Sequence, residues 1–292
     1  MSETIAAQQD VRNITRRIRE VAALPQVVFQ IIQLTDNMAT SARDIERVVS
    51  VDPGLSTRIL TLANSSYYAL PRKVTSIREA VVFLGFRAIR QLAMTVGCFE
   101  LFVGKSDRSS LWHRERWRHA LSVANYSRSL GAVVRDCLPD EAYAAGLLHD
   151  IGKSLLCRYG GTDYLKVEDL IKTGVPTLEA EITIYGCDHA ILGREVAAQW
   201  HFPKSLADAI GTHHEFISDV ESPVLTATIA TANAITHFVS EHQEENDDEV
   251  SPLVAIPEWA KPILNTNDDS LLAWVKTCRE TLDAATSLSN VL

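Results

Sequence analysis

The stretch Ala-Tyr-Ala-Ala-Gly-Leu-Leu-His-Asp-Ile-Gly-Lys, residues 142–153, is apolar, rich in small side chains, and contains an adjacent histidine and aspartate. An uninterrupted run of this kind predicts a buried helix. The pair at its end, His149 and Asp150, is unusual because a buried carboxylate is costly unless it is paired, hydrogen-bonded or bound to a metal. Imidazole beside carboxylate is also a common ligand pair for divalent transition metals. The stretch therefore raises the question of which other residues could complete a metal site.

The composition is that of a globular protein, with 46% hydrophobic and 22% charged residues in 292. This length suits one large domain or two ordinary ones. The formal net charge of -9 argues against direct binding of nucleic acid. Part of that charge lies in an acidic run at residues 244–249, which predicts a solvated loop, with an acidic docking site as the lesser alternative.

Neither a membrane span nor a secretion signal is expected. No apolar stretch reaches the length that a bilayer requires, and the first ten residues are polar. The cysteines are widely spaced and form no Cys-x-x-Cys motif; they are Cys98, Cys137, Cys157, Cys187 and Cys278. They are expected to be buried thiols in a reducing compartment, so the predicted location is cytoplasmic, without membrane contact.

Apolar residues recur at helical spacing, and no useful alternation of period two occurs, so the predicted fold class is all-α. Ser41 with Asp44, and Ser76 with Glu79, have the spacing of capping boxes. Gly85 suits the end of a helix that begins at residue 77. The polar segment 105–110 is the best internal boundary, and a long helix is expected after it, over residues 112–130.

Six side chains of the second half could converge near helix ends: His119, His149, Asp150, His189, His213 and His214. Any one of these histidines alone is better explained by hydrogen bonding in the core or at the surface. Two adjacent pairs among the six make a shared metal site more plausible than six separate roles. Glu115 lies four residues before His119 and therefore on the same helix face. The remaining histidines, His113, His201, His237 and His242, fit no such pattern and are expected at the surface.

The chain resembles the HDOD domain, a relative of the HD superfamily of metal-dependent phosphohydrolases that occurs in bacterial signalling proteins. The matching stretches, in order, are Leu24-Pro25, residues 51–56, 59–65, 76–85, 144–153, 189–193, 200–203 and His213-His214. The resemblance implies a multi-helix bundle in which a small N-terminal helical part packs on an HD-like core. Its expected limits are 20–240 for the domain, with parts 20–104 and 110–240. An N-terminal helical extension at 1–19 and an acidic loop with C-terminal helices at 241–292 flank it.

The chain also resembles the HD-GYP phosphodiesterases, and this resemblance implies a ligand set. Glu115, His119, His149, Asp150, His189, His213 and His214 match metal positions of that family, and Lys153 matches its phosphate-contacting lysine. Two features differ. No Gly-Tyr-Pro motif follows His214, and Asn233 stands where the late helical aspartate completes the family's site. Asparagine is a neutral and weaker ligand.

Two main interpretations follow from these resemblances. In the first, the chain is a signalling module that binds a protein partner or a nucleotide, and any metal is structural. In the second, it is a metal-dependent phosphohydrolase that acts on a nucleotide or cyclic dinucleotide, with Asp150 and Lys153 at the reacting phosphate. We expect one or two ions of iron, manganese, zinc or nickel, or none in the first case. A polar histidine network without metal is a third interpretation, and it ranks lower because incomplete networks are costly.

Overall fold

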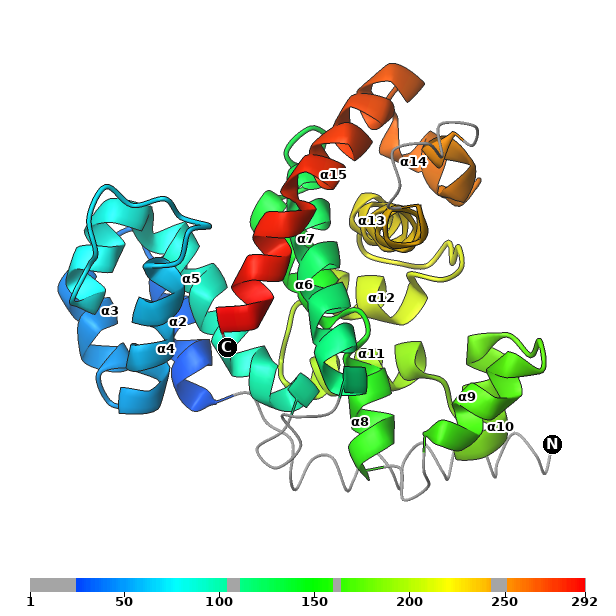
Figure 1. The fold of residues 1–292 in the computed structure, drawn as a ribbon, viewed down its shortest axis with the longest axis horizontal. Helices are drawn as coiled ribbons and strands as arrows, with labels where there is room; N and C mark the ends of the chain where they lie inside the picture. Colours follow the sequence, from blue (N-terminus) through cyan, green and yellow to red (C-terminus); the bar gives the residue numbers. More distant parts are fainter. Residues whose placement is uncertain (1–24, 104–110, 160–163, 243–250, 292) are drawn as a thin grey trace.

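The computed structural model describes residues 25–103, 111–159, 164–242 and 251–291. Every regular element in these ranges is a helix, which confirms the predicted all-α class (Figure 1). The expected N-terminal extension at 1–19, the polar boundary at 105–110 and the acidic run at 244–249 lie outside the described residues.

Residues 25–103 form a group of four helices, α2 (Gln26–Asp36), α3 (Ala42–Val49), α4 (Pro53–Ala63) and α5 (Ile77–Val103), which make up the described part of the N-terminal half. Their starts follow local chemistry. Ser41 and Asp44 form the expected capping box at α3, and the Asp52 side chain accepts a hydrogen bond of 3.0 Å from the Leu55 amide at α4. These bonds satisfy amide groups that a helix start leaves without partners.

Helix α5 changes direction at Gly85, whose φ of 82° and ψ of 167° are readily adopted only by glycine. The helix expected to end at this glycine therefore continues in a new direction as far as Val103. Within the described ranges, α5 is the one helix long and apolar enough to cross a membrane by length and composition. The expectation that no stretch reaches that length was wrong. Its second part nevertheless contributes Ile89, Leu92 and Phe102 to the protein core.

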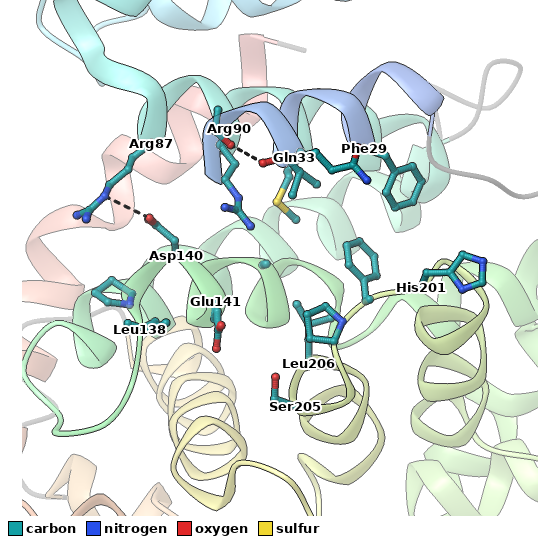
Figure 2. A pocket seen from close by; sticks show the side chains of 17 residues that line it. Phe29, Gln33, Arg87, Arg90, Leu138, Asp140, Glu141, His201, Ser205 and Leu206 are labelled. Atoms are coloured by element: carbon teal, nitrogen blue, oxygen red, sulfur yellow. Dashed lines mark hydrogen bonds and ion pairs between the residues drawn. The ribbon is translucent and has the colours of Figure 1, made fainter. Parts of the chain in front are cut away.

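The second half contains eight helices: α6 (Leu111–Gly131), α7 (Pro139–Leu148), α8 (Ile151–Tyr159), α9 (Leu165–Lys172), α10 (Thr177–Tyr185), α11 (His189–Gln199), α12 (Lys204–Thr212) and α13 (Pro223–Glu241). The two halves meet where α2 and α5 face α7 and α12, and a pocket remains at this junction (Figure 2).

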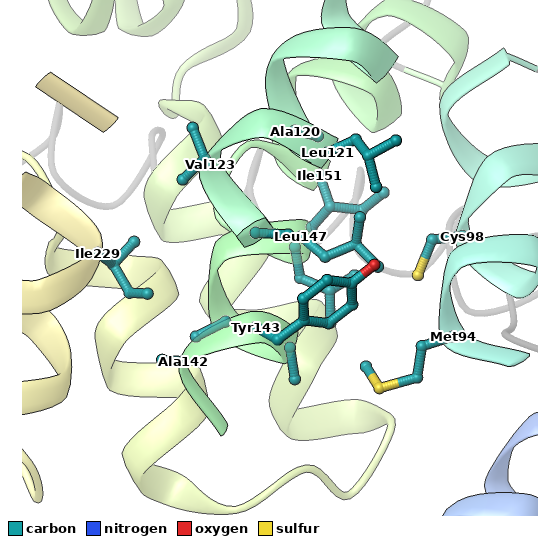
Figure 3. Close-up of a cluster of buried hydrophobic side chains, with 14 of the residues drawn as sticks. Met94, Cys98, Ala120, Leu121, Val123, Ala142, Tyr143, Leu147, Ile151 and Ile229 are labelled. Atoms are coloured by element: carbon teal, nitrogen blue, oxygen red, sulfur yellow. The ribbon is translucent and has the colours of Figure 1, made fainter. Parts of the chain in front are cut away.

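The core is continuous through the helices that surround α7. Figure 3 shows Tyr143 and Leu147 of α7 between Met94 and Cys98 of α5 and side chains of α6. The close approach of α7 to α6 depends on Gly146, where an added Cβ would lie 2.9 Å from the Ala124 Cα atom. The buried Tyr143 hydroxyl is satisfied because it lies 2.7 Å from the Thr95 hydroxyl.

The C-terminal elements are a 3₁₀ turn at Pro252–Ala255, α14 (Ala260–Leu264) and α15 (Asp268–Val291). Helix α15 lies along α6 (Figure 1). The Tyr126 hydroxyl donates to the Cys278 carbonyl at 2.8 Å, and the Trp274 indole donates to Ser129 at 2.8 Å. These bonds attach the C-terminal helix to the centre of the second half.

Two local expectations need correction. His113 was expected at the surface and is buried, since it lies on the face of α6 that also carries buried Trp117. The five cysteines are all free as expected, although Cys157 is only half-buried.

Candidate metal centre

The corner between α7 and α8 carries His149 as the C-cap residue of α7, followed directly by Asp150. Its position is set by Gly152. An added Cβ at Gly152 would lie 1.9 Å from the His189 carbonyl oxygen, so only glycine lets α8 approach the start of α11 this closely. As a result Asp150 Oδ1 lies 3.2 Å from His189 Nε2, although 39 positions separate the two residues.

Histidine rings surround the Asp150 carboxylate. Its Oδ1 lies 3.6 Å from His149 Nε2 and 3.9 Å from His213 Nε2, and its Oδ2 lies 3.9 Å from His119 Nε2. Two groups of side chains have ligand atoms within 4.8 Å of one another: Asp150, His189, His213 and His214, and His119, His149 and Asp150. The two groups share Asp150.

Backbone carbonyls fix the ring orientation of two histidines through the Nδ1 atom, which is the ring nitrogen that does not face Asp150. His149 Nδ1 lies 2.8 Å from the Gly146 carbonyl, and His213 Nδ1 lies 2.8 Å from the Ile210 carbonyl. A carbonyl can only accept, so each Nδ1 carries the proton and each Nε2 presents its lone pair to the centre. Histidines that bind metals are held in this way by a partner at the second nitrogen.

His189 is held instead by the carboxylate of Glu181, a residue that the sequence analysis did not identify as part of the site. Glu181 Oε2 lies 2.6 Å from His189 Nδ1 and accepts the His189 backbone N–H at 2.8 Å. The Tyr164 hydroxyl donates to the same carboxylate. Glu181 is buried on α10 while Glu179 on the same helix is exposed. The spacing of eight residues to His189 gave no local signal for this contact.

The centre contains buried polar atoms that make no hydrogen bond to any described residue. They are His119 Nε2, His149 Nε2, Asp150 Oδ1, His213 Nε2 and Asn233 Oδ1. Unpaired buried polar atoms are rare and each calls for an explanation such as an ion. Because the unpaired His149 Nε2 and His213 Nε2 atoms lie within 3.9 Å of the unpaired Asp150 Oδ1, the donor set fits a divalent transition metal.

The protonation states agree with this fit. Burial lowers the pKa of His119 to about 3 and that of His149 to about 3, and burial also lowers the pKa of His214 to about 2. Burial alone would raise the pKa of Asp150, but Lys153 and His149 hold it well below its usual value. At neutral pH these three histidines are therefore neutral and Asp150 is ionised, which are the forms that bind metal. His189 differs, because Glu181 and Asp150 raise its pKa against the effect of its burial.

The remaining candidates lie at different distances from this centre. Lys153 is buried, and its Nζ lies 2.7 Å from Asp150 Oδ2. Asn233 of α13 lies beside His119 and favours the protonated form of its ring. Glu115 is exposed on α6 and belongs to neither group of ligand atoms. His237 is partly solvent-exposed, as expected of a surface residue, but its ring centroid is 4.6 Å from that of His119.

Comparison with known proteins yields one family match. The model of the HDOD domain matches residues 21–216. An uncharacterized protein of Treponema pallidum (strain Nichols) is 24% identical over 230 residues, which are 78% of this chain and 44% of that protein. The chain thus spans less than half the length of this curated relative.

Solved structures show the same fold. A Shewanella amazonensis SB2B protein, provisionally named a phosphohydrolase, is 23% identical with a TM-score of 0.77, covering 96% of this chain and 97% of its own. An HDOD domain protein of unknown function from Geobacter sulfurreducens is 21% identical with a TM-score of 0.74, covering 95% and 98%. A Marinobacter aquaeolei VT8 protein, provisionally named a signal transduction protein, is 18% identical with a TM-score of 0.77, covering 98% and 66%. At these identities the likeness concerns the fold alone.

Proposed function

The chain belongs to the HDOD domain family, and on this basis we propose that it is a signal-transduction module with a single structural metal ion at the Asp150 centre. The ion would be held by Asp150, His149, His189 and His213, with His214 at the solvent-exposed edge of the site. Iron, manganese, zinc and nickel all suit mixed imidazole and carboxylate ligands.

The proposal of one ion, and not two, depends on the position of Lys153. Asp150 is the sole carboxylate in the two ligand groups, and it stands between them. A carboxylate in this place could bridge two metal ions, with one ion on each oxygen. However, the Lys153 ammonium lies 2.7 Å from Oδ2, so one positive charge already neutralises the side that faces His119. The histidines add no negative charge, and a second divalent ion would face strong repulsion there.

The other described residues support binding more than turnover. Asn233 supplies a neutral amide, so it does not offset the positive charge of a second ion. Lys153 is buried and ion-paired with Asp150, so its ammonium group already holds the carboxylate in place and is not available to a phosphate while that ion pair is intact. A bound ion would supply Lewis-acid chemistry to water or phosphate.

The alternative function is that of a metal-dependent phosphohydrolase or phosphodiesterase. The observation that favours it is the exposure of His214, because its Nε2 lies 2.9 Å from buried His189 Nε2 and so connects the centre with solvent. A phosphate could approach along this edge, and Lys153 is the cation that would balance its charge. A nucleotide or cyclic dinucleotide would be the substrate, as expected from the HD-GYP resemblance.

Metal stoichiometry tests the proposal. We expect one ion per chain in protein purified without chelator, and close to two ions in Lys153→Gln when metal is added, because that change frees Asp150 Oδ2. The matched control is Lys172→Gln, which removes an exposed lysine paired with Asp169 at 3.1 Å and should leave one ion. Two ions in the unaltered chain, or none after addition of iron or manganese, would contradict the proposal.

Activity separates the two functions. Hydrolysis of a phosphodiester by the metal-loaded chain, abolished in both His149→Ala and Asp150→Ala, would establish the alternative instead. As a module, the folded Asp150→Ala variant is expected to retain its signalling protein partner in a binding assay. Loss of that partner only after metal removal would tie the interaction to the centre.

A further inference from the structure

A cavity of about 720 Å³ lies at the junction of the two halves, away from the metal centre (Figure 2). Its walls are α2 and α5 on one side and the starts of α7 and α12 on the other, and none of the candidate metal ligands lines it. Its volume falls within the range of small-molecule sites, about 300–1,000 Å³. We propose that this cavity binds a purine nucleotide. Only one part of this inference rests on the proposed function, namely that the nucleotide is the signal to which the module responds.

One end of the cavity offers aromatic surface. Phe29 of α2 and Phe202, just before α12, line it with ring centroids 5.8 Å apart and planes tilted by 43°. Both rings are half-buried, so they are held in place yet still face the cavity. Flat aromatic side chains are the usual stacking partners of bases, and a purine presents the largest base face for stacking.

The wall formed by α5 offers positive charge. Arg90 projects from α5 towards α7 (Figure 2), and Arg87 lies nearly one turn before it. The Arg87 Nε atom lies 3.6 Å from Asp140 Oδ2, and the arginine side chain is 86% exposed. Exposed ion pairs contribute only about 0–1 kcal/mol, so a phosphate can replace this carboxylate as the partner of Arg87. Guanidinium groups bind phosphate oxygens through paired hydrogen bonds.

The opposite wall offers acceptors. Glu141 of α7 and Ser205 of α12 line the cavity below Arg90. A lining with cations on one wall and two carboxylates, Asp140 and Glu141, and a hydroxyl on the other suits a ligand that is anionic at one end and carries N–H donors at the other. A nucleotide has this distribution, because its phosphate is anionic and the edge of its base carries N–H groups. Inorganic phosphate would use the arginines alone.

The cavity also has a physical connection with the metal centre. Helix α7 begins at the cavity with Pro139 and ends at His149, and α12 begins there at Lys204 and ends at His213. A ligand that joins α2 and α5 to these two helices would therefore act on the elements that hold two metal ligands. Sites connected through packed rigid helices can be coupled in this way.

Calorimetric titration of the full chain tests this inference, with GMP and AMP as probes and with inorganic phosphate and guanosine as partial probes. We expect at least one nucleotide to bind more tightly than either partial probe. Arg90→Ala should weaken nucleotide binding about tenfold or more through loss of a charged hydrogen bond. Phe202→Leu should weaken it about tenfold through loss of stacking while keeping an apolar side chain at this position.

The matched control is Arg78→Ala, which removes the same charge from α5 where Arg78 pairs with Glu46, away from the cavity. Equal weakening in Arg78→Ala and Arg90→Ala would show unspecific attraction and overturn the proposal. If Arg90→Ala does not fold, Arg90→Lys provides the test, since it keeps the charge and loses the paired geometry. Absence of heat with both nucleotides would also overturn it.

Each titration is performed on metal-free and on metal-loaded protein. Nucleotide binding without metal uptake would contradict the proposed metal centre and leave the cavity assignment intact. Metal uptake at one ion per chain without nucleotide binding would do the reverse.

Discussion

Glu181 shows how a residue outside the metal-ligand groups can govern the centre. Its carboxylate lies 2.6 Å from His189 Nδ1 and is fully buried. A carboxylate behind a metal-binding histidine fixes the ring and raises its basicity, and loss of such a partner typically reduces metal affinity about 10–100-fold. We therefore expect Glu181→Gln to weaken metal binding within this range, as measured by competition with a chromophoric chelator.

The control for this prediction is Glu179→Gln, since Glu179 lies on the same helix and is exposed. Circular dichroism should show unchanged helix content in both variants. Unaltered metal affinity in a folded Glu181→Gln protein would mean that His189 does not ligate the ion.

At the scale of single residues, the sequence predicted the His149–Asp150 pair but not the residues that hold His189 beside it. The positions of His149 and Asp150 were evident because a polar pair at the end of an apolar helix is costly without a partner. Glu181 and Tyr164 were not evident, since their contacts arise where α9 and α10 fold back on the start of α11. No periodicity in the chain records a contact of that kind.

At the scale of elements, Gly152 marks a contact between α8 and the start of α11 that leaves no room for a side chain. An added Cβ would lie 1.9 Å from the His189 carbonyl and 2.8 Å from its Cα atom, both of which are backbone atoms. We expect Gly152→Ala to lower the free energy of unfolding by about 3 kcal/mol or more, because α8 and α11 must separate. Chemical denaturation measures this loss, and metal affinity should fall with it.

The comparison variant is Gly54→Ala, where the nearest atom to the new Cβ is a side-chain oxygen of Asp52 at 3.2 Å. Its effect should be small, since that side chain can move. Equal destabilisation by both substitutions would show that crowding at His189 is not the cause.

Element boundaries followed from local rules wherever a local bond decides them. The Ser41 capping box was predicted because it acts within one turn. The start of α12 has no such bond, because its N-cap residue is Pro203, which makes no side-chain capping bond. The continuation of α5 past Gly85 was also unpredictable locally, since core packing on both sides of the bend sustains it.

At the scale of the whole molecule, the buried histidines determine how the metal-free protein responds to acid. Burial lowers the pKa of His119, His149 and His213 below 6.5, whereas carboxylates raise that of His189 against the effect of its burial. As pH falls to 5, the unfolded chain thus comes to bind about three more protons at these sites than the folded chain. Stability should fall as pH falls from 6.5 to 5, by about 1.4 kcal/mol per unit for each proton once titration is complete.

Denaturant titrations of chelator-treated protein at several pH values measure this slope. His213→Gln should reduce it, while His201→Gln, which alters an exposed histidine, should not. A stability that is constant from pH 6.5 to 5, or that rises as pH falls, would contradict the prediction.

The all-α class and the family were predictable at this scale, but the cavity was not. Its lining comes from α2, α5, α7 and α12, which are distant in sequence and meet only when the two halves pack together. Each of its residues taken alone resembles an ordinary surface or core side chain. A mixed lining of this kind becomes visible only in three dimensions.

The dipoles of helices α7 and α12 also affect which ions bind at the two ends of these helices. Helix α7 ends at His149 and α12 ends at His213, and both begin beside the cavity. Each helix therefore has its C-terminus at the histidine centre and its N-terminus at the cavity. A helix carries about half a negative charge at its C-terminus and half a positive charge at its N-terminus. The fold itself therefore favours a cation at the histidine end and an anion at the opposite end, before any side-chain charge is considered.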